Sequence, residues 1–584
     1  MIKKISFSLF FLVPILLLSS CREGEPNVEY VLGEGYPAEK DKEFDNGSDV
    51  VFPNLNDQLI FDLELLCKIW GFLKYHHPEV GEGKFNWDYD LFRVLPKYLL
   101  VNNAGERDKV ILDWINKLGK VPTCKTCTET PSDAYIKPNL LWVENSNMEN
   151  TLKIILKEIY QNRHQWGHYY FQSNSIGQII FSHESPHNFY HPDAGFRLLA
   201  LFRYWNIIHY FFPYKYLTDK NWDNILHEYI PLFVSANNKL EYELATFQLI
   251  GEINDSHATF SIRPEIEKLR GPYFAPFRIW FVEGKWVVTD YYNPKLKESI
   301  GIEVGDIITH INGESIESII ESRKNLYPAS NEASQLRDMS FDLLRSTNNS
   351  LNVTFLSSEQ SGQKTIPLYR KTELNFYSWY KVNPNEKCYR FLNDRIGYIT
   401  LASITSENVS EIKNTFKNTK GIIIDIRNYP NDFVPYVLGS YFVSKPTSFF
   451  KVTRSNTTNP GEFTFTDGGI IPFTGETYNG KLIVIVNEIT QSQAEFTAMA
   501  FRSGINTTII GSTTAGTDGD ISFFTLPGGL QSSISGIGIY YPDGTGTQRV
   551  GIIPDVWVEP TIQGIREGRD ELLERAIELI NEGK

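Results

Sequence analysis

The sequence lacks three features that would place it quickly in a large functional class: a long apolar run beyond its first twenty residues, a cluster of basic side chains, and a full set of zinc-type cysteines. A membrane-spanning helix needs about 20 apolar residues, so the chain after its N-terminus is not expected to cross a bilayer. Phosphate binding requires a basic surface, and the formal charge of −14 therefore argues against nucleic acid as a partner and against anionic polymers as substrates.

Cysteine is also scarce, with 5 in 584 residues. Cys124 and Cys127 form a C-x-x-C pair, which suits a local disulfide, a redox pair, half of a zinc site or two buried thiols. Because the chain has no second C-x-x-C, we expect no zinc site at this pair. No other metal site and no cofactor are expected. Cys67 and Cys388 are expected in hydrophobic cores.

Residues 1–20 have the pattern of an export signal, because two lysines precede an apolar run that is too short to span a membrane. The run ends in Leu-Ser-Ser-Cys21, the cleavage pattern of bacterial lipoproteins, which predicts acylation of Cys21. An ordinary secretory signal with an incidental cysteine is the alternative. We therefore expect a membrane-anchored lipoprotein of the cell envelope, facing the periplasm or the exterior, with residues 21–55 as a flexible tether.

An internal repeat organises the next part of the chain. A tryptophan, a tyrosine and a proline followed by Asn-Trp-Asp begin at Trp70, and the same pattern begins again 135 residues later at Trp205. The apolar periodicity predicts two helical modules, at 56–128 and 191–265, on either side of a less regular linker at 129–190. Only the second copy ends in a Ser-His pair.

Residues 266–373 change to the pattern of short strands. A Gly-Asp turn at Gly305-Asp306, an apolar strand and an Asn-Gly turn at Asn312-Gly313 resemble a PDZ domain. PDZ domains bind peptide ends by adding a strand to a sheet edge. A generic small β-domain is the alternative.

Residues 374–584 alternate apolar strands with helical stretches. Four such strands are expected, at 395–401, 421–426, 481–486 and 508–511. Continuous apolar strands of this kind predict a sheet buried on both faces. The chain is therefore expected to be a multidomain α/β protein.

Ser492 lies where strand 481–486 turns into a predicted helix. A hydroxyl there faces the positive end of a helix dipole, which favours developing negative charge, and the N–H of Gln493 is then an oxyanion donor. The same residues, Ser-Gln-Ala-Glu, also spell a capping box, which needs no role beyond beginning a helix.

The run Thr-Gln-Ser-Gln-Ala-Glu around Ser492 resembles the nucleophile motif of the tail-specific, or C-terminal processing, protease family, over roughly residues 190–584. The resemblance implies a serine peptidase with helical cap modules, a PDZ-like domain and an α/β core of the crotonase/ClpP-like type. One branch of that family uses a lysine, but no lysine lies between Lys481 and Lys584. The other branch, the core of tricorn protease, implies His257 as general base and Ser256 as an orienting hydroxyl.

Two positions depart from the tricorn-type pattern. Gln548 stands where a glutamate belongs to the histidine network. An amide stabilises an imidazolium less than a carboxylate does, so either turnover is slow or another acid contributes. The loop after Arg427 lacks the family's glycines, and Pro430 has no N–H, which leaves Asn431 or Tyr429 as the second oxyanion donor.

These patterns predict a serine-type endopeptidase or carboxy-terminal processing peptidase that hydrolyses exported or unfolded polypeptides. Its PDZ-like domain is expected to bind substrate ends. A non-catalytic peptide-binding lipoprotein that keeps the peptidase fold is the alternative. No particular oligomeric state is predicted.

Overall fold

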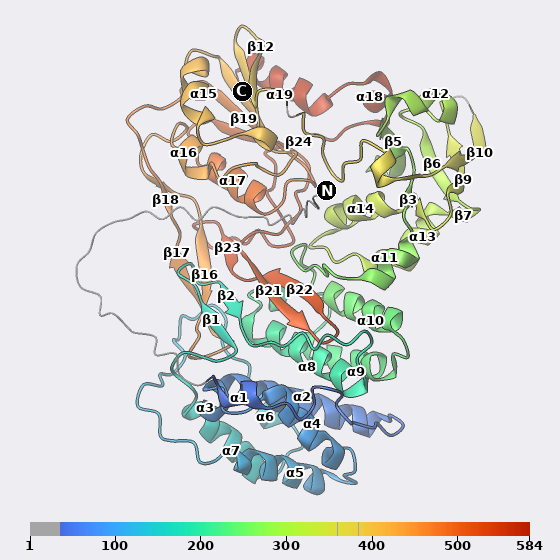
Figure 1. The fold of residues 1–584 in the computed structure, drawn as a ribbon. Coiled ribbons are helices and arrows are strands. Elements are labelled where there is room, and N and C mark those ends of the chain that lie inside the picture. The colour runs from blue at the N-terminus through green and yellow to red at the C-terminus, as the bar shows by residue number, and fades with distance from the viewer. Residues whose placement is uncertain (1–34, 359, 384, 584) are drawn as a thin grey trace, which may run out of the picture.

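The computed structural model describes residues 35–358, 360–383 and 385–583 (Figure 1). The predicted export signal and the lipidation site Cys21 lie outside this range. Within it, no helix is both long and apolar enough to cross a bilayer. The helical modules lie at one end of the molecule in Figure 1, and the α/β core and the β-rich residues 266–373 lie side by side at the other.

Residues 35–55, expected to belong to a flexible tether, instead pack against the first helical module. They include the short helix α1 (Pro37–Lys40). The ring of Phe44 is buried against Tyr89, and the hydroxyl of Ser48 donates to Asp193 over 2.6 Å. The polar composition that suggested a tether conceals a few apolar side chains that anchor the segment.

The two halves of the repeat fold in the same way. The helices of the first module are α2 (Asp57–His76), α3 (Pro78–Gly81), α4 (Trp87–Tyr98) and α5 (Ala104–Lys117). Those of the second are α8 (Ala194–Phe211), α9 (Ile225–Ser235), α10 (Lys239–Gly251) and α11 (Pro264–Arg270). In the first module the indoles of Trp70 and Trp87 each donate to the other residue's carbonyl, at 3.0 and 2.9 Å. Trp205 and Trp222 repeat this reciprocal pair at 2.9 and 3.1 Å. The conserved spacing of the motif therefore reflects one local interaction made twice.

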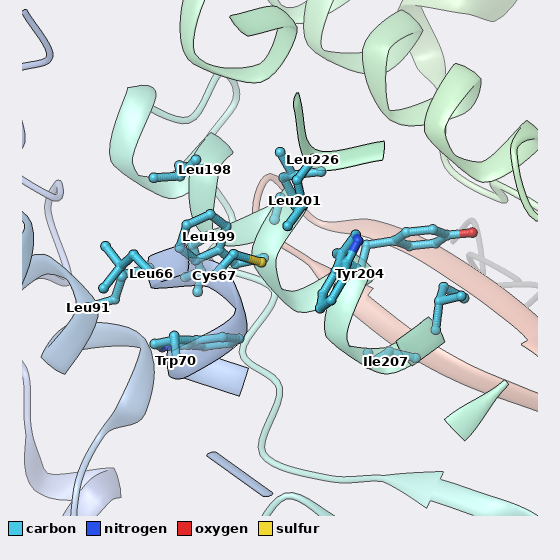
Figure 2. Close-up of a cluster of buried hydrophobic side chains, with 14 of the residues drawn as sticks. Leu66, Cys67, Trp70, Leu91, Leu198, Leu199, Leu201, Tyr204, Ile207 and Leu226 are labelled. Carbon is cyan, nitrogen blue, oxygen red and sulfur yellow. The ribbon is translucent and has the colours of Figure 1, made fainter. Parts of the chain in front are cut away.

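The modules share one hydrophobic core, part of which is drawn in Figure 2. Helices α2 and α8 meet where Gly71 lies against Asn206. The Asn206 amide donates to the carbonyls of Cys67 and Phe202, at 3.0 and 2.9 Å. Gly71 and Asn206 are themselves equivalent positions of the repeat.

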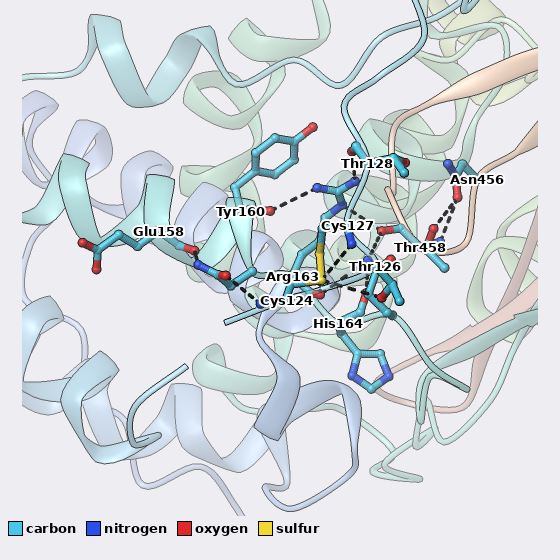
Figure 3. The surroundings of a disulfide bond; sticks show 12 residues. Cys124, Thr126, Cys127, Thr128, Glu158, Tyr160, Arg163, His164, Asn456 and Thr458 are labelled. Atoms are coloured by element: carbon cyan, nitrogen blue, oxygen red, sulfur yellow. Dashed lines mark hydrogen bonds between the residues drawn. A yellow bond between two sulfur atoms is a disulfide. The ribbon is translucent and has the colours of Figure 1, made fainter. Parts of the chain in front are cut away.

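The segment between the modules carries more regular structure than expected. It contains α6 (Leu141–Asn145), α7 (Asn150–Gln161), β1 (Phe171–Ser173) and β2 (Ile179–Phe181). Cys124 and Cys127 form a disulfide (Figure 3), and the N–H of Cys124 donates to the side chain of Asn162 over 2.8 Å. Of the alternatives for this pair, the structure has the local disulfide. Cys67 and Cys388 are free and buried.

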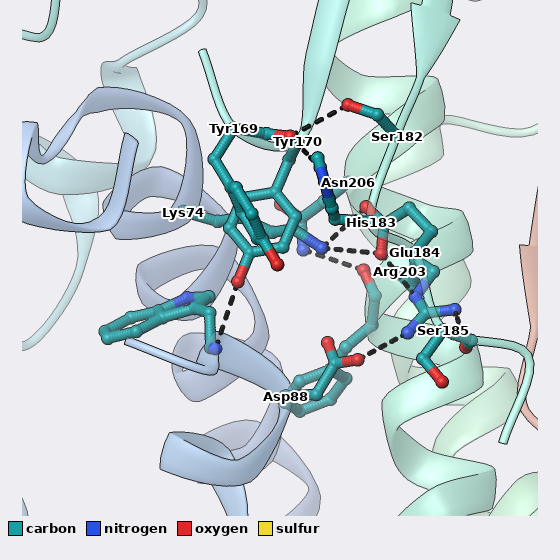
Figure 4. Close-up of polar contacts among 12 residues, drawn as sticks. Lys74, Asp88, Tyr169, Tyr170, Ser182, His183, Glu184, Ser185, Arg203 and Asn206 are labelled. Atoms are coloured by element: carbon teal, nitrogen blue, oxygen red, sulfur yellow. Dashed lines mark hydrogen bonds and ion pairs between the residues drawn. The ribbon is translucent and has the colours of Figure 1, made fainter. Parts of the chain in front are cut away.

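A buried ion-pair network joins the two modules and the linker (Figure 4). Lys74 of α2 contacts Glu184 over 2.6 Å. Arg203 of α8 contacts both Glu184, at 2.8 Å, and Asp88 of α4, at 2.6 Å. All four side chains are almost inaccessible to solvent. Each charge therefore depends on its partners for compensation.

Residues 266–373, which in the sequence follow the second module and precede the core, contain one larger sheet in the order β10-β9-β6-β5-β4. Its strands are β4 (Phe277–Val282), β5 (Lys285–Tyr291), β6 (Ile307–Ile311), β9 (Ser350–Leu356) and β10 (Ser361–Pro367), with helices α13 (Ile316–Arg323) and α14 (Glu332–Asp342). Asn312 and Gly313 both have positive φ, at 52° and 85°, as a tight hairpin turn requires. Strand β4 forms an edge of the sheet, and α14 packs against it.

Residues 374–584 are built on a sheet in the order β12-β13-β14-β19-β20-β24. Its strands are β12 (Tyr389–Asn393), β13 (Ile396–Thr400), β14 (Gly421–Asp425), β19 (Lys481–Val486), β20 (Thr507–Gly511) and β24 (Val556–Trp557). All neighbours from β13 to β24 are parallel. Helix α17 (Gln493–Arg502) packs on one face and α19 (Glu571–Glu582) on the other. The expected multidomain α/β architecture, with a sheet buried on both faces, is confirmed.

A hairpin from this core reaches the helical modules. Strands β21 (Ile521–Leu526) and β22 (Leu530–Ser535) form it, and in Figure 1 it lies between the core and α8. Ser532 of β22 forms a bridge with Phe260, just after the Ser-His pair. This hairpin therefore places the C-terminal part of the chain against the loop that follows α10.

Candidate active site

Ser492 has a strained backbone. It lies between β19 and α17 with φ 56° and ψ −121°, a combination that residues other than glycine rarely adopt. Such a conformation costs about 1–3 kcal/mol and persists only where the surroundings impose it. The side chain is half-buried, so its hydroxyl is presented at the start of the helix.

The carboxylate of Glu495 imposes part of this geometry. It accepts from the N–H of Ser492 at 3.2 Å and from the N–H of Thr517 at 3.0 Å. It also accepts from Gly516 and from the hydroxyl of Thr514. Burial raises the pKa of Glu495 to about 7, against these hydrogen bonds, which act to lower it. The predicted capping-box glutamate therefore binds the 514–517 loop to the serine turn.

His257 lies in the loop after α10 and is buried. Its Nδ1 is 2.9 Å from the hydroxyl of Ser535, on β22. Its Nε2 is buried and makes no hydrogen bond to any of the residues that the structure describes. Burial lowers the pKa of His257, and the nearby charge of Asp255 acts in the opposite direction.

Asp255 is the residue of this site that the sequence pattern did not single out. It is fully buried. Its carboxylate accepts from the hydroxyl of Ser535 at 3.0 Å and from the hydroxyl of Thr517 at 2.7 Å. The N–H groups of Ser535 and His257 donate to it as well, at 2.8 and 3.1 Å. The local signal for it was present: an aspartate two residues before the predicted base.

Gln548 and Ser256 lie near this group but do not contact the imidazole through hydrogen bonds. The Gln548 amide donates to Asp255 over 3.2 Å. The Ser256 hydroxyl accepts from the N–H of Ser330 at 2.9 Å and lies 3.2 Å from the hydroxyl of Ser334. Ser256 therefore joins its loop to the start of α14.

Ser492 and His257 approach each other through Thr517. The N–H of Ser492 donates to the Thr517 carbonyl over 2.9 Å, and the Thr517 hydroxyl donates to Asp255. No hydrogen bond links the Ser492 hydroxyl to His257 Nε2 in the described part of the chain. The structure thus brings the predicted nucleophile and base to opposite sides of one residue without joining them directly.

A cavity of about 470 Å³ opens beside Ser492. About half of its lining residues are aromatic or aliphatic, among them Tyr429, Phe433, Phe496 and Ile537. The charged residues Arg454, Asp467, Asp518 and Asp520 line other parts of it. Burial raises the pKa of Tyr429, and the neighbouring Ser492 hydroxyl opposes that shift. The space is therefore suited to an apolar side chain next to the hydroxyl.

The two predicted oxyanion donors differ in availability. The N–H of Gln493 is the first of α17 and has no acceptor within its helix. The N–H of Asn431 donates to the Leu401 carbonyl over 2.9 Å, and its side-chain amide donates to Ile404. Asn431 is therefore already engaged in holding its loop and is not free to bind an oxyanion, contrary to the expectation from sequence.

Several solved structures are similar to this chain. Mature CPAF, solved in complex with lactacystin, is 14% identical, with a TM-score of 0.52 over 67% of this chain and 99% of that one. A putative peptidase from Parabacteroides merdae is 17% identical, with a TM-score of 0.40 over 67% of this chain and 97% of that one. The tricorn protease is 18% identical, with a TM-score of 0.33 over 66% of this chain and 36% of that one. The likeness to CPAF concerns the fold.

No curated protein matches the chain by sequence. The family model that does match is that of peptidase family S41, over residues 395–558, which contain Ser492 and Gln548. The match begins within the expected catalytic region, 374–584. Residues 395–558 are therefore similar to peptidase family S41, and this match supports a serine peptidase activity on polypeptides.

Proposed function

We propose that this protein cleaves peptide bonds with Ser492 as nucleophile and His257 as general base. The observation that carries the proposal is the strained conformation of Ser492, at a helix start within the peptidase domain. Strain of this kind gathers where function requires it.

In the proposed reaction the Ser492 hydroxyl attacks the substrate carbonyl while His257 Nε2 takes the proton. The N–H of Gln493 donates to the oxyanion, and the departing amine receives the proton from His257. Water then attacks the acyl-enzyme carbonyl and gives a proton to His257. The Ser492 oxygen leaves the acyl group and takes that proton back from His257. Nε2 has no competing hydrogen-bond partner among the described residues, so it is available to the Ser492 hydroxyl.

Substrates of the proposed enzyme are polypeptides, as endopeptidase or carboxy-terminal processing targets. The cavity beside Ser492 supports an apolar side chain next to the cleaved bond. The edge strand β4 and the adjacent α14 support peptide-end binding by the PDZ-like domain. The N-terminal sequence supports a lipid anchor at Cys21 and a position in the cell envelope, which a Cys21→Ala variant found in the soluble fraction would demonstrate.

The proposal is tested by labelling the detergent-solubilised full-length protein with a fluorophosphonate probe and by following casein cleavage. We expect Ser492→Ala and His257→Ala to lose both, while His310→Ala, a histidine of the PDZ-like domain, keeps both. Comparing peptides with a free and an amidated C-terminus distinguishes processing from internal cleavage.

A second candidate is a peptide-binding protein without catalytic activity. The missing Ser492–His257 hydrogen bond favours it. A wild-type protein that binds peptides but neither labels nor cleaves would establish this candidate and reject the peptidase.

A further inference from the structure

We infer that Asp255, acting through the hydroxyl of Ser535, supplies the negative charge behind His257 that Gln548 cannot supply. This inference rests on the proposed function of His257 as a base. Asp255 and Ser535 are positioning residues, since neither is expected to touch the substrate.

The direction of the hydrogen bonds carries the first step. A carboxylate only accepts, so the Ser535 hydroxyl donates its proton to Asp255, at 3.0 Å. Its oxygen is then left to accept from His257 Nδ1, at 2.9 Å. A histidine protonated at Nδ1 has its lone pair on Nε2, which is the tautomer that a general base requires.

The second step is the environment of the Asp255 carboxylate. Every polar group that contacts it is a donor: two hydroxyls, two backbone N–H groups and the Gln548 amide. Such a set fits the charged form of a carboxylate, since the backbone N–H groups and the amide N–H can only donate and both hydroxyls donate to it as well. The site therefore holds a fixed negative charge one hydroxyl away from the imidazole.

The third step concerns Gln548. Its Nε2 lies 3.2 Å from Asp255 Oδ1, so a glutamate at this position would set two carboxylates against each other. The amide instead stabilises the charge of Asp255. Gln548, which replaces the glutamate of the tricorn-type pattern, and Asp255 thus complement each other: Asp255 carries the negative charge, and the Gln548 amide stabilises it.

Other titratable groups do not replace Asp255 in this role. Tyr204 of α8 and Tyr214 face Asp255, and burial raises the pKa of both well above its ordinary value, so they stay neutral. Glu495 lies beyond Thr517, whose N–H it binds. Among the described residues, Asp255 is the charge that acts on the pKa of His257.

The experiment measures fluorophosphonate labelling of Ser492 in the full chain as a function of pH. We expect Asp255→Asn and Ser535→Ala to lower the rate by about 100-fold. Removing the negative charge lowers the pKa of His257, so the acid limb of the Asp255→Asn profile moves to lower pH. A purely structural loss would lower the rate without moving that limb.

Ser532→Ala is the matched control. Ser532 lies three residues from Ser535 on β22 and is also buried, and its hydroxyl makes no hydrogen bond to any of the residues that the structure describes. Its variant is expected to keep the wild-type rate and profile. Asp255→Asn with an unchanged profile would overturn the inference.

Gln548→Glu provides an independent test. We expect it to lower the labelling rate, and Asp255→Asn combined with Gln548→Glu to recover part of it, because the pair then again holds one charge and one amide. A Gln548→Glu variant that labels faster than wild type would overturn the inference.

The titration of His257, followed by NMR of ring-labelled histidine, gives a readout without activity. Its pKa is expected to fall in Asp255→Asn and to stay unchanged in Ser532→Ala. If wild-type protein fails to label, the proposed function fails, while this titration still decides whether Asp255 acts on His257.

Discussion

Gly71 and Asn206 occupy equivalent positions of the repeat and touch where α2 crosses α8. A Cβ built on Gly71 would lie 1.8 Å from Asn206 Oδ1, so no larger residue fits without displacing that amide. We expect Gly71→Ala to destabilise the helical modules by about 2 kcal/mol, as overpacked cores do. Thermal unfolding measures this. Gly167→Ala, at a glycine with no atom within 4 Å of an added Cβ, should leave the transition unchanged.

Arg203 is the centre of the buried ion-pair network. Arg203→Ala would leave Asp88 without its arginine and Glu184 with Lys74 alone, and losing one partner of a buried pair costs about 3–5 kcal/mol. Denaturant unfolding should show this loss. The exposed pair of Lys157 and Glu144 is the control, because Lys157→Ala is expected to cause no measurable change. Equal effects of the two variants would contradict the assigned role of the network.

Replacing Ser492 separates strain from chemistry. Glycine adopts positive φ freely, so Ser492→Gly should raise the free energy of unfolding by about 1 kcal/mol while abolishing labelling. Ser492→Ala also removes the hydroxyl but keeps the strained backbone, and should not gain stability. A stability gain in Ser492→Ala as large as in Ser492→Gly would argue that the hydroxyl, not the backbone, is the source of the cost.

Glu495 should make stability depend on pH. Its pKa rises from an ordinary 4.5 to about 7 on folding. The contribution of Glu495 to the free energy of unfolding is therefore fully present below pH 4.5 and is lost as the pH rises through about 7. The reason is that the unfolded chain releases this proton at a lower pH than the folded protein does. The loss amounts to about 3 kcal/mol. Unfolding of wild type and Glu495→Gln at several pH values should show a flatter dependence in the variant.

Some of these features follow from local sequence. The two Trp pairs are spaced identically in both copies of the motif, so the sequence indicates that both copies make the same local contact. The strands at 421–426 and 481–486 were predictable because continuous apolar runs of that length need burial on both faces. The serine turn was predictable from the motif around Ser492.

The rest depends on contacts between distant parts of the chain. Asp255 contacts Thr517, Ser535 and Gln548, which lie between 262 and 293 residues later in the chain. The periodicity of a sequence gives no information on contacts between such distant residues. Asn431 has a side chain suited to an oxyanion role, but its N–H is committed to Leu401, 30 positions earlier. The packing of residues 35–55 depends on a few apolar side chains in a polar segment. The average composition of the segment does not show them.

The hairpin β21–β22 has a consequence for the order in which the protein becomes competent. A ribosome makes Asp255 and His257 long before it reaches Ser535. The proposed nucleophile Ser492 is made after His257 and before Ser535. The imidazole therefore lacks its partner on Nδ1 until nearly all of the chain has been synthesised. A nascent or truncated chain that ends before residue 535 holds the nucleophile and the base without the strand that orients them, so any cleavage by this protein begins only after its own synthesis is almost complete.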